Sequence, residues 1–269
     1  FEVSRGGEAA HVAIFLRQRP GEPSRCCVHR LDDPCGPPTA AVSFAQADAA
    51  TVRWNAEGTA LLLQLSTEVD ESGKSYYGST ALHHVLAEGP ASVVATPGGP
   101  IHDVAWCPTR DEFLVLRGHQ PCNVALYCGR KAELLRDFGE DLGQSYWNTI
   151  RWNPFGSFLA LGGFGQLAGD LDFVDTASRS KLGQCRYDCC VDCQWSPDGR
   201  LLMGWTAAPR MRVDNRVEIY DYLGNRLLKI DFEELYSAAW RPAPGEHDDR
   251  PPTPGRSRVA GQAGDGKKA

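Results

Sequence analysis

Two arginines lie on a short polar stretch of this sequence and could bind an anion. Arg210 and Arg212 flank Met211, and a guanidinium can hold a phosphate through two parallel hydrogen bonds. The alternative is that both arginines pair with acids or carbonyls of a neighbouring element, with Asp214 and Asn215 forming the turn. Neither interpretation is catalytic.

The cysteines could be taken for a metal site. Cys190 and Cys193 have a Cys-x-x-Cys spacing, and Cys185 and Cys189 precede them. A structural zinc site needs four converging ligands. If 189–193 is a strand, Cys190 and Cys193 face opposite sides of it, and no second pair completes the set. We therefore interpret all ten cysteines as reduced packing thiols and expect no bound metal.

Two further groups could suggest catalysis or nucleotide binding. His83 and His84 are neighbours that would face opposite sides of a strand, and His102-Asp103 precedes a strand in which such a pair commonly satisfies backbone groups. The glycine-rich run 162–165 joins two apolar strand-like segments, whereas a phosphate-binding loop leads into a helix. No nucleophile–base set can be assembled. The sequence predicts a non-enzymatic protein without a cofactor.

Tryptophans at the start of tight turns organise the whole chain. Trp152–Gly156 and Trp195–Gly199 are near-copies of one turn, with Pro to preset φ and Gly to accept a positive φ. Related units begin at Trp54, Trp106 and Trp240, which gives spacings of 52, 46, 43 and 45 residues. A period of about 40–45 residues with four strands per unit is typical of β-propeller blades. We expect these five tryptophans to be blade anchors.

The apolar runs around these turns place the other strands. The first blade should carry Phe1 in the tryptophan position, and Trp240 should end a strand over 237–240. A long hairpin is expected over 60–86, with its tip at 70–74. Further strands are expected near 11–16, 26–31, 41–44, 51–54, 92–96, 101–106, 112–117, 123–128, 133–138, 148–152, 157–161, 170–174, 191–195, 200–204, 217–222 and 226–230.

Composition divides the chain into a body and an arm. The 269 residues carry a net charge of −6 and contain no apolar run long enough to span a membrane. Residues 1–242 should form the propeller, and the Pro/Gly-rich segment 243–269 should be disordered. From Arg250 onward there are five positive charges and one negative, a net +4, which leaves −10 for residues 1–249. The positive residues of this arm are RNA-contact candidates: Arg250, Arg256, Arg258, Lys267 and Lys268.

Three motifs resemble those of the eukaryotic translation initiation factor 2A family. The first is Ser66-Thr67-Glu68-Val69-Asp70 followed by Ser75-Tyr76-Tyr77-Gly78 and Leu82-His83. The second is Leu161-Gly162-Gly163-Phe164-Gly165-Gln166-Leu167 with Gly169, and the third is Ala208-Pro209-Arg210-Met211-Arg212-Val213-Asp214-Asn215. Ile101-His102-Asp103-Val104 with Trp106 also fits. The resemblance runs from Phe1 to about Pro242. Asp214 stands where the family more often has Asn.

The resemblance implies a nine-bladed propeller, of which this chain would hold about five blades. An unpartnered last strand would fit a piece of that larger propeller, and a closed five-bladed ring is the alternative. The family's activity would be cytoplasmic translation initiation: binding the small ribosomal subunit and delivering initiator Met-tRNA without GTP. Its partners would be that subunit, the tRNA, mRNA and other initiation factors, with no membrane and no small-molecule substrate.

Two other functions remain open from the sequence. One is a general WD-repeat interaction scaffold, such as a protein related to the b subunit of initiation factor 3. The other is a propeller attached to an enzyme domain outside this chain, because a fold does not fix a function.

Overall fold

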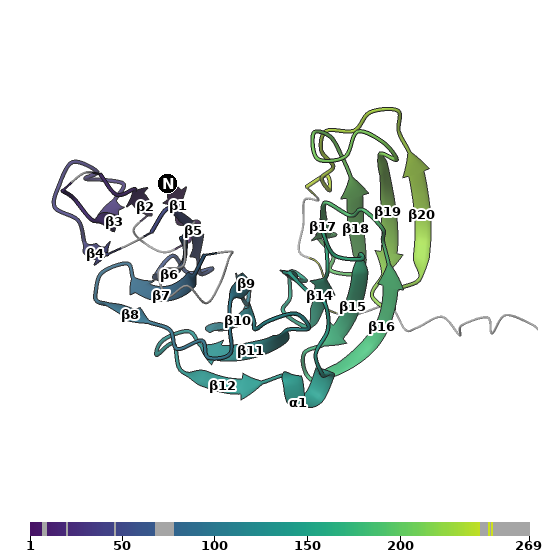
Figure 1. Ribbon diagram of the computed structural model, residues 1–269, viewed down its shortest axis with the longest axis horizontal. Coiled ribbons are helices and arrows are strands. Elements are labelled where there is room, and N and C mark those ends of the chain that lie inside the picture. Colours follow the sequence, from purple (N-terminus) through teal and green to yellow (C-terminus); the bar gives the residue numbers. More distant parts are fainter. Residues whose placement is uncertain are drawn as a thin grey trace, which may run out of the picture.

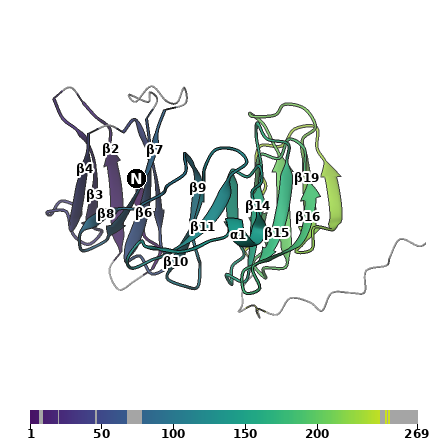
Figure 2. The same ribbon diagram turned by 60° about the horizontal axis from the view of Figure 1, so that its bottom comes forward.

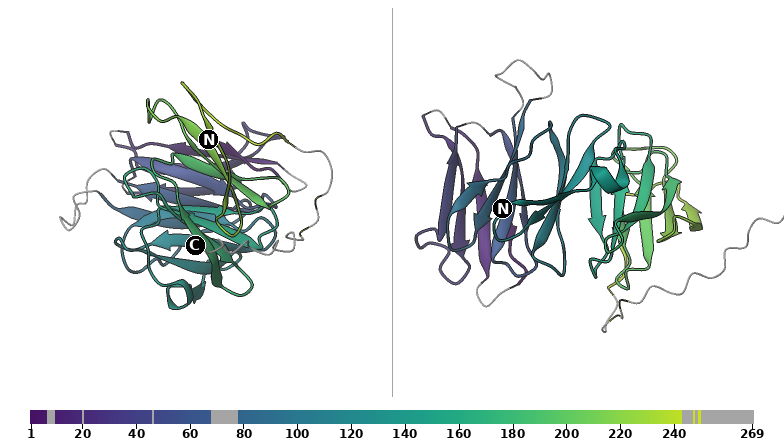
Figure 3. Two further views of the ribbon diagram at one scale, coloured as in Figure 1. Left: turned by 90° about the vertical axis from the view of Figure 1, so that its right-hand side faces the viewer. Right: turned by 90° about the horizontal axis from the view of Figure 1, so that it is seen from below.

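The computed structural model describes residues 1–6, 10–19, 21–45, 47–67, 78–242, 247 and 249. These residues form five four-stranded antiparallel sheets, and in each sheet the strands pair in chain order. The sheets are the blades of a propeller that follow one another around an open arc (Figure 1). Figures 2 and 3 show the blades side by side, with their strands running between the two rims of the arc.

The four strands of every blade are consecutive, and the first of the four lies innermost on the concave side. Blade 1 consists of β1 (Glu2–Val3), β2 (His11–Leu16), β3 (Ser24–Arg30) and β4 (Ala40–Phe44). Blade 2 consists of β5 (Ala49–Trp54), β6 (Ala60–Ser66), β7 (Thr80–Leu86) and β8 (Ala91–Val93). Blade 3 consists of β9 (Ile101–Trp106), β10 (Glu112–Arg117), β11 (Asn123–Cys128) and β12 (Leu134–Asp137). Blade 4 consists of β13 (Thr149–Trp152), β14 (Phe158–Gly162), β15 (Asp170–Asp175) and β16 (Ser180–Arg186). Blade 5 consists of β17 (Asp192–Trp195), β18 (Leu201–Thr206), β19 (Arg216–Asp221) and β20 (Arg226–Asp231).

The predicted all-β propeller of about five blades is confirmed. Two elements were not predicted: β16, whose alternation is interrupted by Gly183, and the one-turn helix α1 (Gly139–Leu142) that connects blades 3 and 4. The predicted hairpin of blade 2 is present as β6 paired with β7, and its tip falls outside the described residues.

The turn between the first and second strands of a blade is built as the sequence predicts. Gly156 and Gly199 have φ values of +71° and +67°, a region that favours glycine. In blade 4 the side-chain oxygen of Asn153 accepts hydrogen bonds from the backbone N–H groups of Ser157 and Phe158. This side chain satisfies turn donors that would otherwise need water.

Four hydrophobic clusters hold the arc together, one at each junction between neighbouring blades. The second strand of a blade is covered on both faces, so it reads as a continuous apolar run rather than an alternating one. Leu61, Leu62 and Leu63 in β6 are each fully buried. Burial of this apolar surface is the main stabilising term of the fold.

Two predictions about the ends of the repeat are wrong. Val3, not Phe1, takes the tryptophan position of blade 1, because Val3 pairs with Val12 as Trp152 pairs with Leu159. The expected strand over 237–240 is not formed. This segment has no neighbouring strand among the described residues to pair with. Trp240 itself still contacts blade 5, because its indole N–H donates to the carbonyl of Gln194.

Candidate functional site

The repeat tryptophans join each blade to the one before it. In blades 2 to 5 the indole Nε1–H donates to a backbone carbonyl on the innermost strand of the preceding blade. Trp240, which follows blade 5, donates in the same way to the innermost strand of blade 5. The donor–acceptor pairs are Trp54–Glu2 (3.2 Å), Trp106–Arg53 (2.8 Å), Trp152–Ala105 (3.3 Å), Trp195–Arg151 (2.9 Å) and Trp240–Gln194 (2.9 Å). The Trp195 side chain is buried, whereas the other four are partly exposed.

A second set of contacts between inner strands is ionic. Asp103 on β9 is 5% exposed and receives four hydrogen bonds. Its Oδ1 accepts from Nη2 of Arg53 at 2.6 Å and from the N–H of Val104, and its Oδ2 accepts from the N–H of Ile150 and from Nη1 of Arg151 at 3.3 Å. One buried carboxylate therefore holds together the inner strands of blades 2, 3 and 4.

The same network extends into blade 5. Nη2 of Arg151 donates to Oδ1 of Asp192 on β17 at 2.7 Å. Arg53, Arg151 and Asp192 were not singled out from the sequence. The signal was available: Arg stands directly before the repeat tryptophan in units 2 and 4, and Asp stands three residues before it in units 3 and 5.

Arg210 and Arg212 occupy a different kind of site. They lie between β18 and β19, on the rim opposite the tryptophan turns, because successive turns of an antiparallel meander alternate between rims. Both are exposed, and neither has an ion-pair or hydrogen-bond partner among the described residues. The predicted alternative, pairing with acids or carbonyls between blades, is therefore not seen. Arg210 does lie against blade 4, since a Cβ on Gly165 would stand 2.3 Å from its Nη2.

Asn215 fixes the conformation of this arginine loop, residues 207–215. It is buried, and its Nδ2 donates to the carbonyls of Met211 and Val213. Its Oδ1 accepts from the N–H of Leu235. Asp214 forms the turn with φ +55°, a conformation that Asp and Asn tolerate better than most residues. The loop thus presents, from a pinned backbone, two guanidinium groups that have no partner in the described part of the chain.

The cysteine cluster differs from the prediction. Residues 189 and 190 precede β17, and Cys189 has φ +61°, so the strand alternation assumed for 189–193 does not apply. Cys190 and Cys193 are consequently buried in one cluster between blades 4 and 5 instead of facing opposite sides. Burial raises the pKa of Cys193 to about 12. All ten cysteines are free thiols, and no group of three or more metal-ligating side chains occurs in the described ranges.

The histidines have structural contacts. His83 packs edge-on against Phe44 of blade 1, and His84 lies toward Trp106 of blade 3, so they face opposite sides of β7 as predicted. Burial lowers the pKa of both imidazoles. Nε2 of His102 contacts the carbonyl of Gly118 at 2.7 Å.

The arm candidates Arg250, Arg256, Arg258, Lys267 and Lys268 lie outside the described residues. The residue just before them is placed: Oδ1 of Asp249 accepts a hydrogen bond of 2.8 Å from Oγ of Ser157. Ser157 directly follows the tryptophan turn of blade 4. Asp249 therefore lies on the tryptophan-turn rim, away from the arginine loop.

These features define a β-propeller whose inner strands are joined by hydrogen bonds and ion pairs, and which carries two exposed arginines on the loop 207–215. A family model described as eukaryotic translation initiation factor eIF2A matches residues 42–238. This chain belongs to the eIF2A family.

Individual relatives agree with the family match. The chain is 36% identical over 245 residues to eukaryotic translation initiation factor 2A of Dictyostelium discoideum, covering 90% of this chain and 39% of that protein. It is 36% identical to the Drosophila melanogaster factor, over 86% of this chain and 36% of that protein. The chain thus spans less than half the length of these relatives.

Solved structures support the same fold. A structure titled "Crystal structure of the eukaryotic initiation factor" matches with a TM-score of 0.73 and 29% identity, over 91% of this chain and 57% of that chain.

The b subunit of eukaryotic translation initiation factor 3 from Neurospora crassa is a more distant relative in sequence, at 25% identity over 72% of this chain and 30% of that protein. No helix in the described part of the chain is long and apolar enough to cross a membrane.

Proposed function

We propose that this protein is a non-enzymatic, cytoplasmic translation initiation factor that binds the small ribosomal subunit and promotes GTP-independent delivery of initiator Met-tRNA. Membership of the eIF2A family supports a role in initiation. The propeller acts as a rigid scaffold, and its loops contact ribosomal RNA, mRNA or other initiation factors.

The observation that carries this proposal is the arginine loop. Arg210 and Arg212 have no partner among the described residues, although the loop that bears them is pinned through the buried Asn215. An exposed guanidinium carried by a pinned loop backbone is suited to bidentate contact with a phosphate. The basic arm after Asp249 adds long-range attraction to RNA, since it carries +4 against −10 for the rest of the chain.

Co-sedimentation with purified small ribosomal subunits across a salt series tests the proposal. We expect the protein to pellet with the subunit and to bind initiator Met-tRNA on filters without GTP. Removal of residues 250–269 should weaken this co-sedimentation mainly at low salt and flatten its salt dependence, because fewer counterions are released. Arg210→Lys keeps the charge and loses the planar fork, so it should weaken binding with little change in salt slope.

Lys131→Gln supplies the matched control for the Arg210 substitution. Lys131 is exposed and unpartnered among the described residues, and it lies on the rim opposite the arginine loop. It should co-sediment like the unchanged protein. A protein that stays in the supernatant at all salt concentrations would contradict the proposed function.

A further inference from the structure

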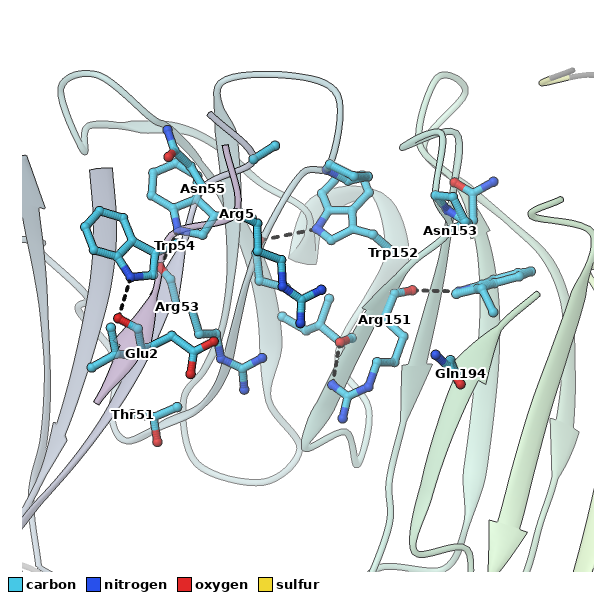
Figure 4. Close-up of a pocket in the computed structure, with 18 of the residues that line it drawn as sticks. Glu2, Arg5, Thr51, Arg53, Trp54, Asn55, Arg151, Trp152, Asn153 and Gln194 are labelled. Carbon is cyan, nitrogen blue, oxygen red and sulfur yellow. Dashed lines mark hydrogen bonds between the residues drawn. The ribbon is translucent and has the colours of Figure 1, made fainter. Parts of the chain in front are cut away.

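A cavity of about 700 Å³ lies on the concave side of the arc, at the tryptophan-turn ends of the inner strands. Figure 4 shows its lining residues converging from several blades. Its aromatic walls are the indoles of Trp54, Trp106, Trp152 and Trp195, of which the first three are partly exposed. The cavity therefore combines aromatic surface with the ends of inner strands that the ion-pair network holds in place.

Four charged side chains line the cavity: Arg5, Arg53, Arg151 and Glu2. Arg53 and Arg151 form ion pairs with Asp103 and Asp192, which stand behind the lining. Arg5 is therefore the cation of the lining whose charge no ion pair among the described residues offsets. Arg5 is exposed and has no partner among the described residues. Arg53 uses Nη2 for Asp103, and its Nη1 makes no hydrogen bond within the described ranges. Both guanidinium groups extend into the space between the blades (Figure 4), and that of Arg5 has its donors available to an anion.

The cavity is also next to the start of the basic arm. Nδ2 of Asn153, a lining residue, donates to Oγ of Ser157 at 3.3 Å, and the same Oγ donates to Asp249 at 2.8 Å. Arg250 follows directly in the sequence. The arginine loop 207–215 lies on the opposite rim, so Asp249 lies on the same rim as the cavity and not on the rim of that loop.

We propose that this concave cavity is a subsite for single-stranded RNA, in which Arg5 holds a phosphate and the indoles receive bases. The inference rests on the proposed RNA-contacting function and locates it. Base–aromatic stacking combined with a cationic wall is the usual chemistry of single-strand binding. A duplex hides its base faces in the helical stack, so only unpaired nucleotides can use the indoles.

Binding of a ten-nucleotide oligouridylate to the whole 269-residue chain tests this assignment, measured by quenching of tryptophan fluorescence across a salt series. Arg5→Gln should weaken binding at least about threefold at low salt and reduce the slope of log affinity against log salt by about 0.7, the value for one phosphate contact on a single strand. Because Arg5 is exposed and makes no hydrogen bond or ion pair in the described part of the chain, its loss should leave the melting temperature unchanged.

Arg17→Gln is the matched control. Arg17 is also exposed and unpartnered among the described residues, belongs to the same blade, and lies past the far end of β2, ~20 Å away along the strand. It should leave both affinity and slope unchanged. Equal effects of the two substitutions would reduce the result to overall charge and overturn the assignment.

Co-sedimentation with the small ribosomal subunit separates this inference from the proposed function. If the protein binds small subunits, yet oligouridylate does not quench its indoles or Arg5→Gln binds oligouridylate like the unchanged protein, the cavity is not the RNA subsite and the proposed function stands. If the unchanged protein binds neither, both proposals are wrong.

Discussion

Two pairs of arginines on this propeller occupy contrasting surroundings. Arg53 and Arg151, on inner strands, share the buried carboxylate of Asp103 and tie neighbouring blades together. Arg210 and Arg212, between β18 and β19, are exposed and without partners among the described residues. The same side chain therefore serves the fold in one place and remains available for a ligand in the other.

The difference follows from position in the blade. Inner strands of adjacent blades approach each other closely, so a cation there meets a carboxylate of the next blade, as Arg151 meets Asp192 at 2.7 Å. A loop at the rim has solvent on one side, and its ion pairs would be worth little. Substitutions on the inner strands should accordingly reduce stability, and substitutions in the arginine loop should reduce binding.

The largest loss of stability is expected at an inner-strand residue whose side chain is both buried and hydrogen-bonded to the neighbouring blade. Trp195 is 5% exposed, and its N–H binds the carbonyl of Arg151. Trp195→Ala should lower the free energy of unfolding by about 3–5 kcal/mol, as large core truncations do. Reversible denaturant unfolding measures this, and a loss below about 1 kcal/mol would show that the ring is not an anchor.

The second-largest loss of stability is expected from removing the carboxylate of Asp103, which blades 2, 3 and 4 share. Asp103→Ala leaves two guanidinium groups and the N–H of Ile150 without their acceptor, which should lower the free energy of unfolding by about 3 kcal/mol. Asp32→Ala is the control, because the Arg30–Asp32 pair is also 2.6 Å long but exposed on both sides. If the two variants unfold alike, the inner network does not stabilise the arc.

A smaller change in stability is expected when the pH is lowered and His84 becomes protonated. His84 is 2% exposed, and burial lowers the pKa of its imidazole. Its neutral form is therefore favoured by folding, and this contribution is present above the unfolded pKa of about 6.5 and is lost as the pH falls through the folded pKa. The melting temperature should drop as the pH is lowered from about 7.5 to 5.5.

His84→Gln should reduce that drop, and His119→Gln, at an exposed position, should not. Parallel pH profiles of melting temperature for the two variants would exclude His84 as the titrating group.

The repeat made most of the fold predictable from the sequence. Trp-turn units mark the innermost strands of blades 2 to 5, because the turn after each of these strands needs a similar local sequence, as at Gly156 and Gly199. The first unit was misplaced by two residues because Val3 offers no aromatic signal. The strand at 237–240 was overpredicted, since a strand needs a partner that a local sequence pattern does not report.

The candidate sites were less predictable because they depend on contacts between blades. The ion-pair network joins residues 41–50 positions apart in the sequence, so no local motif contains both members of a pair. Cys190 and Cys193 were placed on opposite faces because the turn at Cys189 was taken for a strand. Arg210 and Arg212 could be proposed from the sequence because they flank Met211 within one recognisable motif.

Parallel measurement of stability and of affinity for the small ribosomal subunit tests the central claim, that loop arginines serve binding and inner-strand arginines serve the fold. The Arg210→Gln/Arg212→Gln double variant should bind the small ribosomal subunit at least about tenfold more weakly, as expected for lost phosphate contacts, with an unchanged melting temperature. Arg151→Gln should lower the melting temperature. A double variant that binds normally but melts early would contradict the account.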